Sequence, residues 1–225
     1  MQLIDTKNKI YLLENNNFEF PTLDMMGGDI VAIGGDFAIP RLINAYKNGI
    51  FPWFIDEYNY IHWYSPKKRM VLKPNEFRLT KSLKRVIRNK GFEIKSNQNF
   101  ENVIKNCATI KRKHEDSSWI DENFIEAYTY LHKLGIAHSV ECYLDNELVG
   151  GLYGLIINNV FCGESMFSKV SNASKVCFYH LCNSAKENNI KLIDAQVYNE
   201  HLASLGAYEI DRREYFNSTF DNEVH

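Results

Sequence analysis

The chain has 225 residues, of which 45% are hydrophobic and 24% are charged, and its formal net charge is −2. This composition is typical of a globular protein with one large or two unequal domains. The small negative charge excludes a protein that coats nucleic acid with its whole surface, although it leaves room for a local basic patch.

The first 70 residues are dense in glycine, proline and aromatic residues, as in MMGGDIVAIGGDF and IFPWFIDEYNYIHWYSP. One helix is predicted among them, from Pro40 to Lys47, because proline lies in its first turn and Gly49 follows its end. We therefore predict a small, irregular N-terminal α/β domain over residues 1–70 and a second domain over residues 71–225.

The second domain is predicted to mix helices and strands. Helices are expected over residues 81–90 after a Thr80 cap, 100–108, from an Asp121 cap to Gly135, 172–187 and 201–205. Strands are expected at GFEIKS, AHSVECYL, ELVGGLYGLII, VFCGESMF, IKLIDAQV and AYEIDRREY. From GFEIKS onward this order matches the acetyltransferase-like (GNAT) fold, which gives an α+β class with a GNAT-like mixed sheet.

In that fold, the strand before the long helix splays from the strand after it and opens a cleft. The segments FCGES and IDAQV would form the two sides of this cleft. Asp194 and Gln196 share one face if IDAQV is a regular strand, and Glu164 follows Gly163, where backbone can approach a ligand closely. These three polar side chains would converge between apolar residues, as in a small-molecule site, namely Leu152, Phe161, Phe178, Leu181 and Ile193. The alternative is a purely structural hydrogen-bond network.

Two further features suggest contacts with nucleic acid. The predicted helix at 81–90 carries four basic residues on one face without an intervening acid, and a polyanion would relieve their repulsion; they are Lys81, Lys84, Arg85 and Arg88. Trp53 and Trp119 could stack on a nucleobase near the cleft. The alternatives are a solvated basic face and tryptophans that only pack the core.

Two absences narrow the choice of chemistry. The segment KVSNASK before the long helix has no glycine, so the backbone cradle that acetyltransferases use for pyrophosphate is not predicted. The five cysteines form no CxxC pair and the seven histidines show no metal-ligand spacing, so we expect reduced thiols and no metal site.

No apolar run reaches ~18 residues and the N-terminus is too polar for a signal peptide, so we expect a cytoplasmic protein.

The sequence resembles the leucyl/phenylalanyl-tRNA–protein transferases. The matching stretches run from Val31 to Phe216 in family order: VAIGGDF, AYKNGIFPWF, HWYSPKKRMVL, SSWIDENF, AYTYLHKLGIAHSVECYLDNELVGGLYG, VFCGESMFSKVSNASK, LIDAQVYNEHLASLGAYEI and RREYF. The resemblance implies transfer of Leu or Phe, and possibly Met, from charged tRNA to proteins that begin with Arg or Lys, which marks them for N-degron-dependent degradation.

The resemblance also implies roles for the candidate residues. The basic helix would hold phosphates of the tRNA acceptor stem, Trp53 and Trp119 would pack on the terminal adenosine, and the apolar cleft would take the amino-acid side chain. Gln196 would accept a hydrogen bond from the incoming amine, with Asp194 polarising Gln196 and Glu164 orienting an amino group. The expected enzyme is a monomer without a cofactor. Two alternatives remain at this point: an acyl-CoA-dependent N-acetyltransferase and a non-catalytic tRNA- or peptide-binding adaptor.

Overall fold

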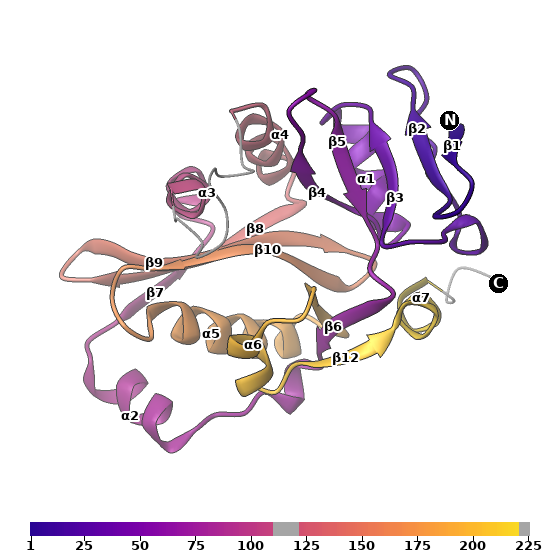
Figure 1. The fold of residues 1–225 in the computed structure, drawn as a ribbon. Helices are drawn as coiled ribbons and strands as arrows, with labels where there is room; N and C mark the ends of the chain where they lie inside the picture. The colour runs from indigo at the N-terminus through magenta and orange to yellow at the C-terminus, as the bar shows by residue number, and fades with distance from the viewer. Residues whose placement is uncertain (110–121, 221–225) are drawn as a thin grey trace.

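Two β-sheets form the framework of the computed structural model, which describes residues 1–109 and 122–220. The smaller sheet has the strand order β1-β2-β3-β5-β4 and carries the helix α1 (Ile39–Lys47), close to the predicted helix at Pro40–Lys47. Figure 1 shows it beside one end of the larger sheet. Its strands are β1 (Gln2–Asp5), β2 (Ile10–Leu13), β3 (Ile30–Gly34), β4 (Phe51–Ile55) and β5 (Ile61–Tyr64).

The larger sheet has the order β12-β6-β11-β10-β9-β8-β7 and is mixed, because β10 and β11 are parallel while its other pairs are antiparallel. The α+β class and the order predicted for the GNAT-like part, from β7 to β12, are confirmed. Its strands are β6 (Lys68–Leu72), β7 (Glu93–Ser96), β8 (Ala137–Leu144), β9 (Glu147–Ile157), β10 (Val160–Ser168), β11 (Leu192–Gln196) and β12 (Tyr208–Asp211).

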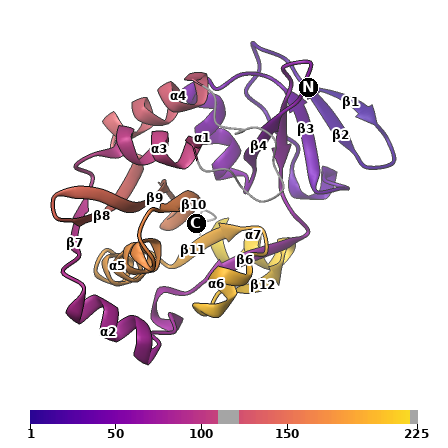
Figure 2. The same ribbon diagram turned by 60° about the vertical axis from the view of Figure 1, so that its left-hand side comes forward.

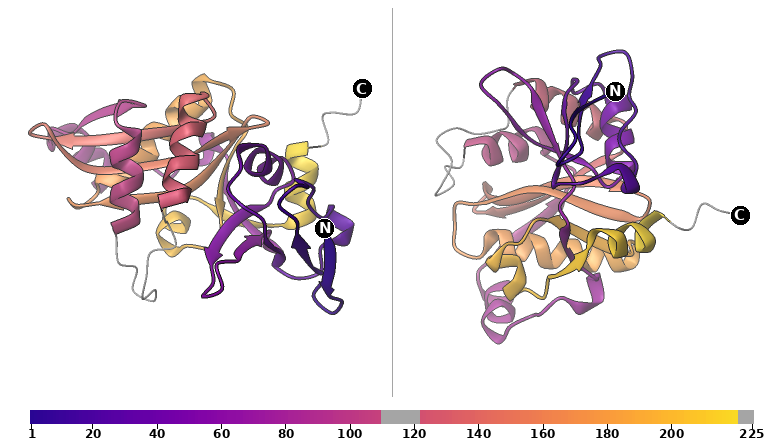
Figure 3. Two further views of the ribbon diagram at one scale, coloured as in Figure 1. Left: turned by 90° about the horizontal axis from the view of Figure 1, so that it is seen from above. Right: turned by 45° about the vertical axis from the view of Figure 1, so that its right-hand side comes forward.

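Helices cover both faces of the larger sheet (Figures 1 and 3). On one face lie α3 (Phe100–Thr109) and α4 (Glu122–Lys133), whose apolar residues join the core of the smaller sheet. On the other face lies α5 (Ala173–Glu187), with α2 (Lys81–Asn89) and α6 (Glu200–Ser204) beside it (Figure 2). The short 3₁₀ helices η1 (Leu23–Met25) and η2 (Pro74–Glu76) and the helix α7 (Arg212–Phe220) complete the described elements.

The parallel ladder between β10 and β11 is short. It joins Val160, Phe161 and Cys162 to Leu192, Ile193 and Asp194, and it does not continue beyond them. Past this point each strand has a bulge, at 163/165 in β10 against β9 and at 194/196 in β11 against β6. A bulge bends its strand and strengthens the local twist. The ends of β10 and β11 no longer pair with each other, although they still pair with β9 and β6. They therefore leave between them the cleft that the GNAT-like prediction required.

One predicted strand needs correction, and one strand was missed. The segment AYEIDRREY forms a strand only over Tyr208–Asp211, and Arg212 begins α7, which turns back toward the smaller sheet. The strand β6 was not predicted, although it pairs with both β11 and β12 and so lies inside the larger sheet. The proposed domain boundary at 70/71 crosses this strand. The predicted cap at Asp121 lies outside the described residues.

No helix among residues 1–109 and 122–220 has the length and apolar character that crossing a bilayer demands.

Candidate active site

A cavity of about 520 Å³ opens between α5, α6 and the diverging ends of β10 and β11. Its volume falls in the range of ligand pockets in proteins, which is roughly 300–1,000 Å³. Apart from Trp119, which lies outside the described residues, the residues predicted to contact the aminoacyl group and the terminal adenosine lie in its wall, namely Trp53, Leu152, Phe161, Gly163, Phe178, Leu181 and Ile193. Their contact with a substrate remains a prediction.

Trp53 reaches this cavity from the smaller sheet. It lies in β4 at a bulge between Pro52 and Phe54, and its ring stacks on Tyr64 with centroids 5.1 Å apart and an interplanar angle of 23°. The ring is therefore held by its neighbour while it lines the cavity. Trp119, the other predicted adenosine contact, lies outside the described residues.

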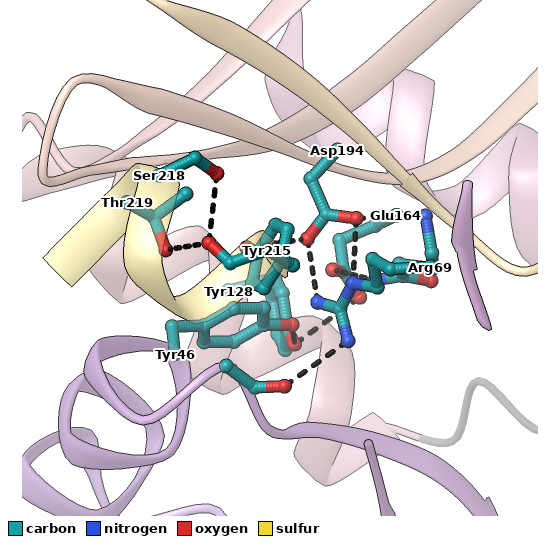
Figure 4. A network of polar contacts seen from close by, with 10 residues as sticks. Tyr46, Arg69, Tyr128, Glu164, Asp194, Tyr215, Ser218 and Thr219 are labelled. Carbon is teal, nitrogen blue, oxygen red and sulfur yellow. Dashed lines mark hydrogen bonds and ion pairs between the residues drawn. The ribbon is translucent and has the colours of Figure 1, made fainter. Parts of the chain in front are cut away.

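Glu164 is the titratable centre of the cavity. Its carboxylate accepts hydrogen bonds from Gln196 Nε2 at 2.8 Å and from the Tyr128 hydroxyl at 3.3 Å, and Tyr128 in turn contacts the Tyr46 hydroxyl (Figure 4). Burial raises the pKa of Glu164 to about 7, although the hydrogen bonds that it accepts act in the opposite direction. A carboxyl group with this pKa is present in both protonation states near neutral pH.

Asp194 has a different environment, because its carboxylate is fully buried and already paired. Arg69 donates to it from both Nε (2.8 Å) and Nη2, and the Tyr215 hydroxyl donates at 2.9 Å (Figure 4). Arg69 also donates to the Gly49 carbonyl at 3.0 Å. Its guanidinium lies 4.6 Å from the ring centroids of both Phe51 and Tyr215. A bidentate pair of this kind is strong and directional, so Asp194 is fixed in place.

The side chains of Asp194 and Gln196 do not converge as a regular strand would require. Gln196 has a left-handed backbone conformation with φ +64° at the bulge in β11. Its backbone N–H donates to Asp194 Oδ1 at 2.9 Å, whereas its carboxamide turns to Glu164. The expected contact between Asp194 and the Gln196 carboxamide is therefore absent from the described hydrogen bonds, and Asp194 acts on Gln196 through the backbone.

The basic face of α2 is exposed at all four predicted positions, Lys81, Lys84, Arg85 and Arg88. The ion pairs among the described residues include none of the four. The helix begins at the predicted cap, where Thr80 Oγ1 accepts from the Leu83 N–H at 3.2 Å, and Leu83 anchors it in the core. The predicted helix and its free cationic face are therefore present, while RNA contact remains a prediction.

Four residues of this site were missed in the sequence: Tyr46, Arg69, Tyr128 and Tyr215. Tyr128 lies in the helix predicted up to Gly135, and the segments that hold Tyr46, Arg69 and Tyr215 appear in the sequence only as stretches that match the family. A basic residue directly before an apolar run, as in KRMVL, could have indicated a buried ion pair with Asp194. Among residues 1–109 and 122–220 no group of three or more His, Cys, Asp or Glu side chains could hold a metal ion.

Comparison with known proteins agrees with this geometry. Residues 71–219 match the family described as leucyl/phenylalanyl-tRNA protein transferase, and residues 35–67 match the N-terminal domain of the same family. The chain belongs to the leucyl/phenylalanyl-tRNA protein transferase family. The relative from Flavobacterium johnsoniae is 50% identical over 92% of this chain and 98% of its own length. The relative from Sulfurimonas denitrificans is 51% identical over 83% and 80%.

Membership of this family makes the chain an aminoacyltransferase whose substrates are aminoacyl-tRNA and protein. Among solved structures, FemX matches with a TM-score of 0.48 and 11% identity, covering 80% of this chain and 70% of that one. This structural likeness is too distant to inform on the function. The transferase assignment depends on the sequence relatives.

Proposed function

We propose that the cavity between β10, β11 and α5 binds the 3′-aminoacyl end of tRNA charged with Leu, Phe or Met. The amino acid is transferred to the N-terminal amine of proteins that begin with Arg or Lys, and the product is marked for N-degron-dependent degradation. The observation that carries the proposal is the apolar cavity beside the hydrogen-bonded pair of Glu164 and Gln196 in a chain of this family. Trp53 would contact the terminal adenosine. Trp119, the second predicted contact of the adenosine, lies outside the described residues.

The reaction is aminolysis of an ester and needs no CoA. The acceptor amine attacks the ester carbonyl carbon, a C–N bond forms, and the bond from that carbon to the ribose oxygen breaks. The Gln196 Nε2 group is already committed to Glu164, so the carboxamide oxygen is left to accept a hydrogen bond from the attacking amine. Such positioning can contribute much of the barrier reduction.

Glu164 is the proposed proton acceptor. The amine must lose a proton as the C–N bond forms, and the ribose oxygen must gain one as it leaves. A carboxylate with a pKa of about 7 can hold that proton between the two steps at neutral pH. Asp194 is unsuited to this role, because its carboxylate oxygens already accept hydrogen bonds from Arg69 and Tyr215 in the core.

The proposal is tested by a transfer assay in which Leu-tRNA, Phe-tRNA and an acyl-CoA compete as donors for peptides that begin with Arg, Lys or Ala. We expect transfer from both charged tRNAs to the Arg and Lys peptides, and none from acyl-CoA. Transfer from acyl-CoA would support an N-acetyltransferase instead. Binding of charged tRNA without any transfer would support a non-catalytic adaptor.

The pH dependence of transfer tests the role of Glu164. Because ionised Glu164 is required, the rate should rise as pH passes through about 7. It should rise again near pH 7.7–8.0 as the acceptor amine loses its proton. The variant Glu164→Gln should keep only the upper inflection. Single-turnover rates between pH 5.5 and 9 measure both, and an unchanged lower inflection in Glu164→Gln would assign it to another group.

The same pKa shift has a consequence for stability. The folded chain retains a proton on Glu164 that the unfolded chain releases above its ordinary value of 4.5. The contribution of this group is therefore fully present below pH 4.5 and is lost as pH rises toward about 7. Denaturant titration between pH 4.5 and about 7 measures this contribution. The free energy of unfolding of the wild type should fall with rising pH by more than that of Glu164→Gln, which has no proton to lose at this position.

Reversing two charges on α2 tests the tRNA contact. The double variant Lys84→Glu/Arg85→Glu should weaken tRNA binding and reduce the slope of log K against log salt by about 1 per lost phosphate contact. The matched control is Lys186→Glu/Lys191→Glu, which reverses two exposed lysines at the other end of α5. If the two double variants show equal slopes of log K against log salt, α2 does not contact the tRNA.

A further inference from the structure

The part of the cavity wall that α5 forms carries a hydroxyl group that has no hydrogen-bond partner among the described residues. Ser174 is 8% exposed and lines the cavity. Its backbone N–H donates to Ser168 Oγ at 3.3 Å, but no hydrogen bond to its own hydroxyl group is present among the described residues. A polar ligand in the cavity would satisfy this group.

A second unpartnered polar atom lies in the same wall. His201, in α6, also lines the cavity, and its Nε2 atom is buried without a hydrogen-bond partner among residues 1–109 and 122–220. Burial and then the nearby charge of Lys175 lower the pKa of His201. Two polar groups without hydrogen-bond partners among the described residues therefore line the cavity, one from α5 and one from α6, and Lys175 follows Ser174 in the chain.

The backbone at this point also favours an anion. Ser174 and Lys175 belong to the first turn of α5, a helix of 15 residues, where the helix dipole is positive, although the N–H groups of Ala173 and Ser174 already donate to Val170 and Ser168. The side chain of the N-cap residue Asn172 does not cap the helix. Figures 1 and 2 show α2 beside α5, and Lys90 Nζ, just after α2, donates to the Ser171 carbonyl at 2.9 Å. The basic helix thus ends next to the start of α5.

We propose that the first turn of α5, with Ser174, Lys175 and His201, binds the phosphodiester that precedes the terminal adenosine of the donor tRNA. This inference depends on the proposed function, because it places one more segment of the same substrate. The phosphates of the acceptor stem lie along α2, the last phosphodiester lies at the start of α5, and the aminoacyl ester lies deeper, beside Glu164 and Gln196. An anionic oxygen satisfies the Ser174 hydroxyl and a His201 N–H donor together.

The charges around the cavity favour this occupant over the acceptor peptide. An acceptor that begins with Arg or Lys brings two positive charges, from its amine and its side chain. The first turn of α5 presents a positive dipole end and Lys175, which would repel such an acceptor and attract a phosphate. The acceptor is therefore expected to approach from another side of Glu164.

Two small donors that differ by one phosphodiester test the inference. One is the 3′-phenylalanyl ester of adenosine, and the other is the same ester of the dinucleotide CpA. The variants Ser174→Ala and Lys175→Met should each lower kcat/KM for the CpA ester about tenfold through KM, while kcat/KM for the adenosine ester stays unchanged. Lys186→Met, which removes an exposed charge from the other end of α5, should change neither value.

Two results would overturn the inference. An equal loss with both donors would place Ser174 and Lys175 against the adenosine or the amino acid, and no loss with either donor would remove them from the site. Calorimetry with unacylated CpA measures binding at this subsite without any transfer. Ser174→Ala and Lys175→Met should each weaken the binding of CpA by the same factor of about ten. If the wild-type protein binds CpA but transfers phenylalanine from neither ester, the proposed function is contradicted, whereas the phosphate subsite is supported.

Discussion

The variant Gln196→Ala is expected to transfer amino acid about 100-fold more slowly than the wild type. The loss follows from the position of the carboxamide, which is held by Glu164 on one side and leaves its oxygen for the acceptor amine. Without it the amine loses its orientation and Glu164 loses the group that links it to the reacting atoms. The basic face of α2 is untouched, so the affinity for tRNA should stay the same.

Single-turnover transfer from Phe-tRNA to an Arg-initiated peptide measures this effect, with tRNA binding measured in parallel. The matched control is Gln2→Ala, because Gln2 is an exposed glutamine in β1 of the smaller sheet. It should leave both quantities at wild-type values. A wild-type rate in Gln196→Ala would show that the carboxamide has no part in the reaction, and a large loss of tRNA binding would assign it to donor recognition instead.

The variant Arg69→Ala is expected to unfold far more easily than the wild type. It leaves the Asp194 carboxylate buried without its cation, and breaking a buried ion pair in this way typically costs 3–5 kcal/mol. For a chain of this size the loss corresponds to a fall in Tm of roughly 6–20 °C. The effect extends beyond one contact, because Arg69 joins the smaller sheet at Gly49, the strand β11 at Asp194 and the helix α7 through the ring of Tyr215.

Thermal unfolding followed by circular dichroism measures this fall. The control is Lys68→Ala on the same strand, since Lys68 and Asp211 form an exposed pair at 3.6 Å, which is worth about 0–1 kcal/mol. If Arg69→Ala unfolds within 2 °C of this control, the buried pair does not stabilise the fold as described. The conservative variant Tyr215→Phe should have a smaller effect, because it removes one hydrogen bond to Asp194 and keeps the ring beside Arg69.

Much of the candidate site was predictable because it depends on patterns that are local in sequence. The helix α2 and its cap at Thr80 follow from amphipathic spacing and a capping residue, and the structure has both. The strands β8, β9 and β10 follow from apolar runs separated by Asn-rich turns. The residues of the cavity wall followed from the GNAT-like order of elements, which brings FCGES and IDAQV to neighbouring strands.

The exceptions arise where one segment depends on a distant one. The strand β6 is short and has too weak a local pattern to be recognised, and its place between β11 and β12 is fixed by pairing across more than 120 positions. The segment RREYF reads as the end of a strand, but its Tyr215 is drawn into the core by Asp194 and Arg69, and the chain there is helical. Period-two alternation predicted that Asp194 and Gln196 share a face, and the bulge between them overrides it.

The sequence by itself determined the family, the GNAT-like arrangement, the apolar wall of the cavity and the identity of Glu164, Asp194 and Gln196 as its polar residues. Only the tertiary structure decided how these three divide their roles. Burial raises the pKa of Glu164 to about 7, and its carboxylate accepts a hydrogen bond from Gln196, while the Asp194 carboxylate is buried and paired with Arg69. Desolvation and the pairing of charges depend on which distant residues surround a carboxylate, and a one-dimensional pattern does not carry that information.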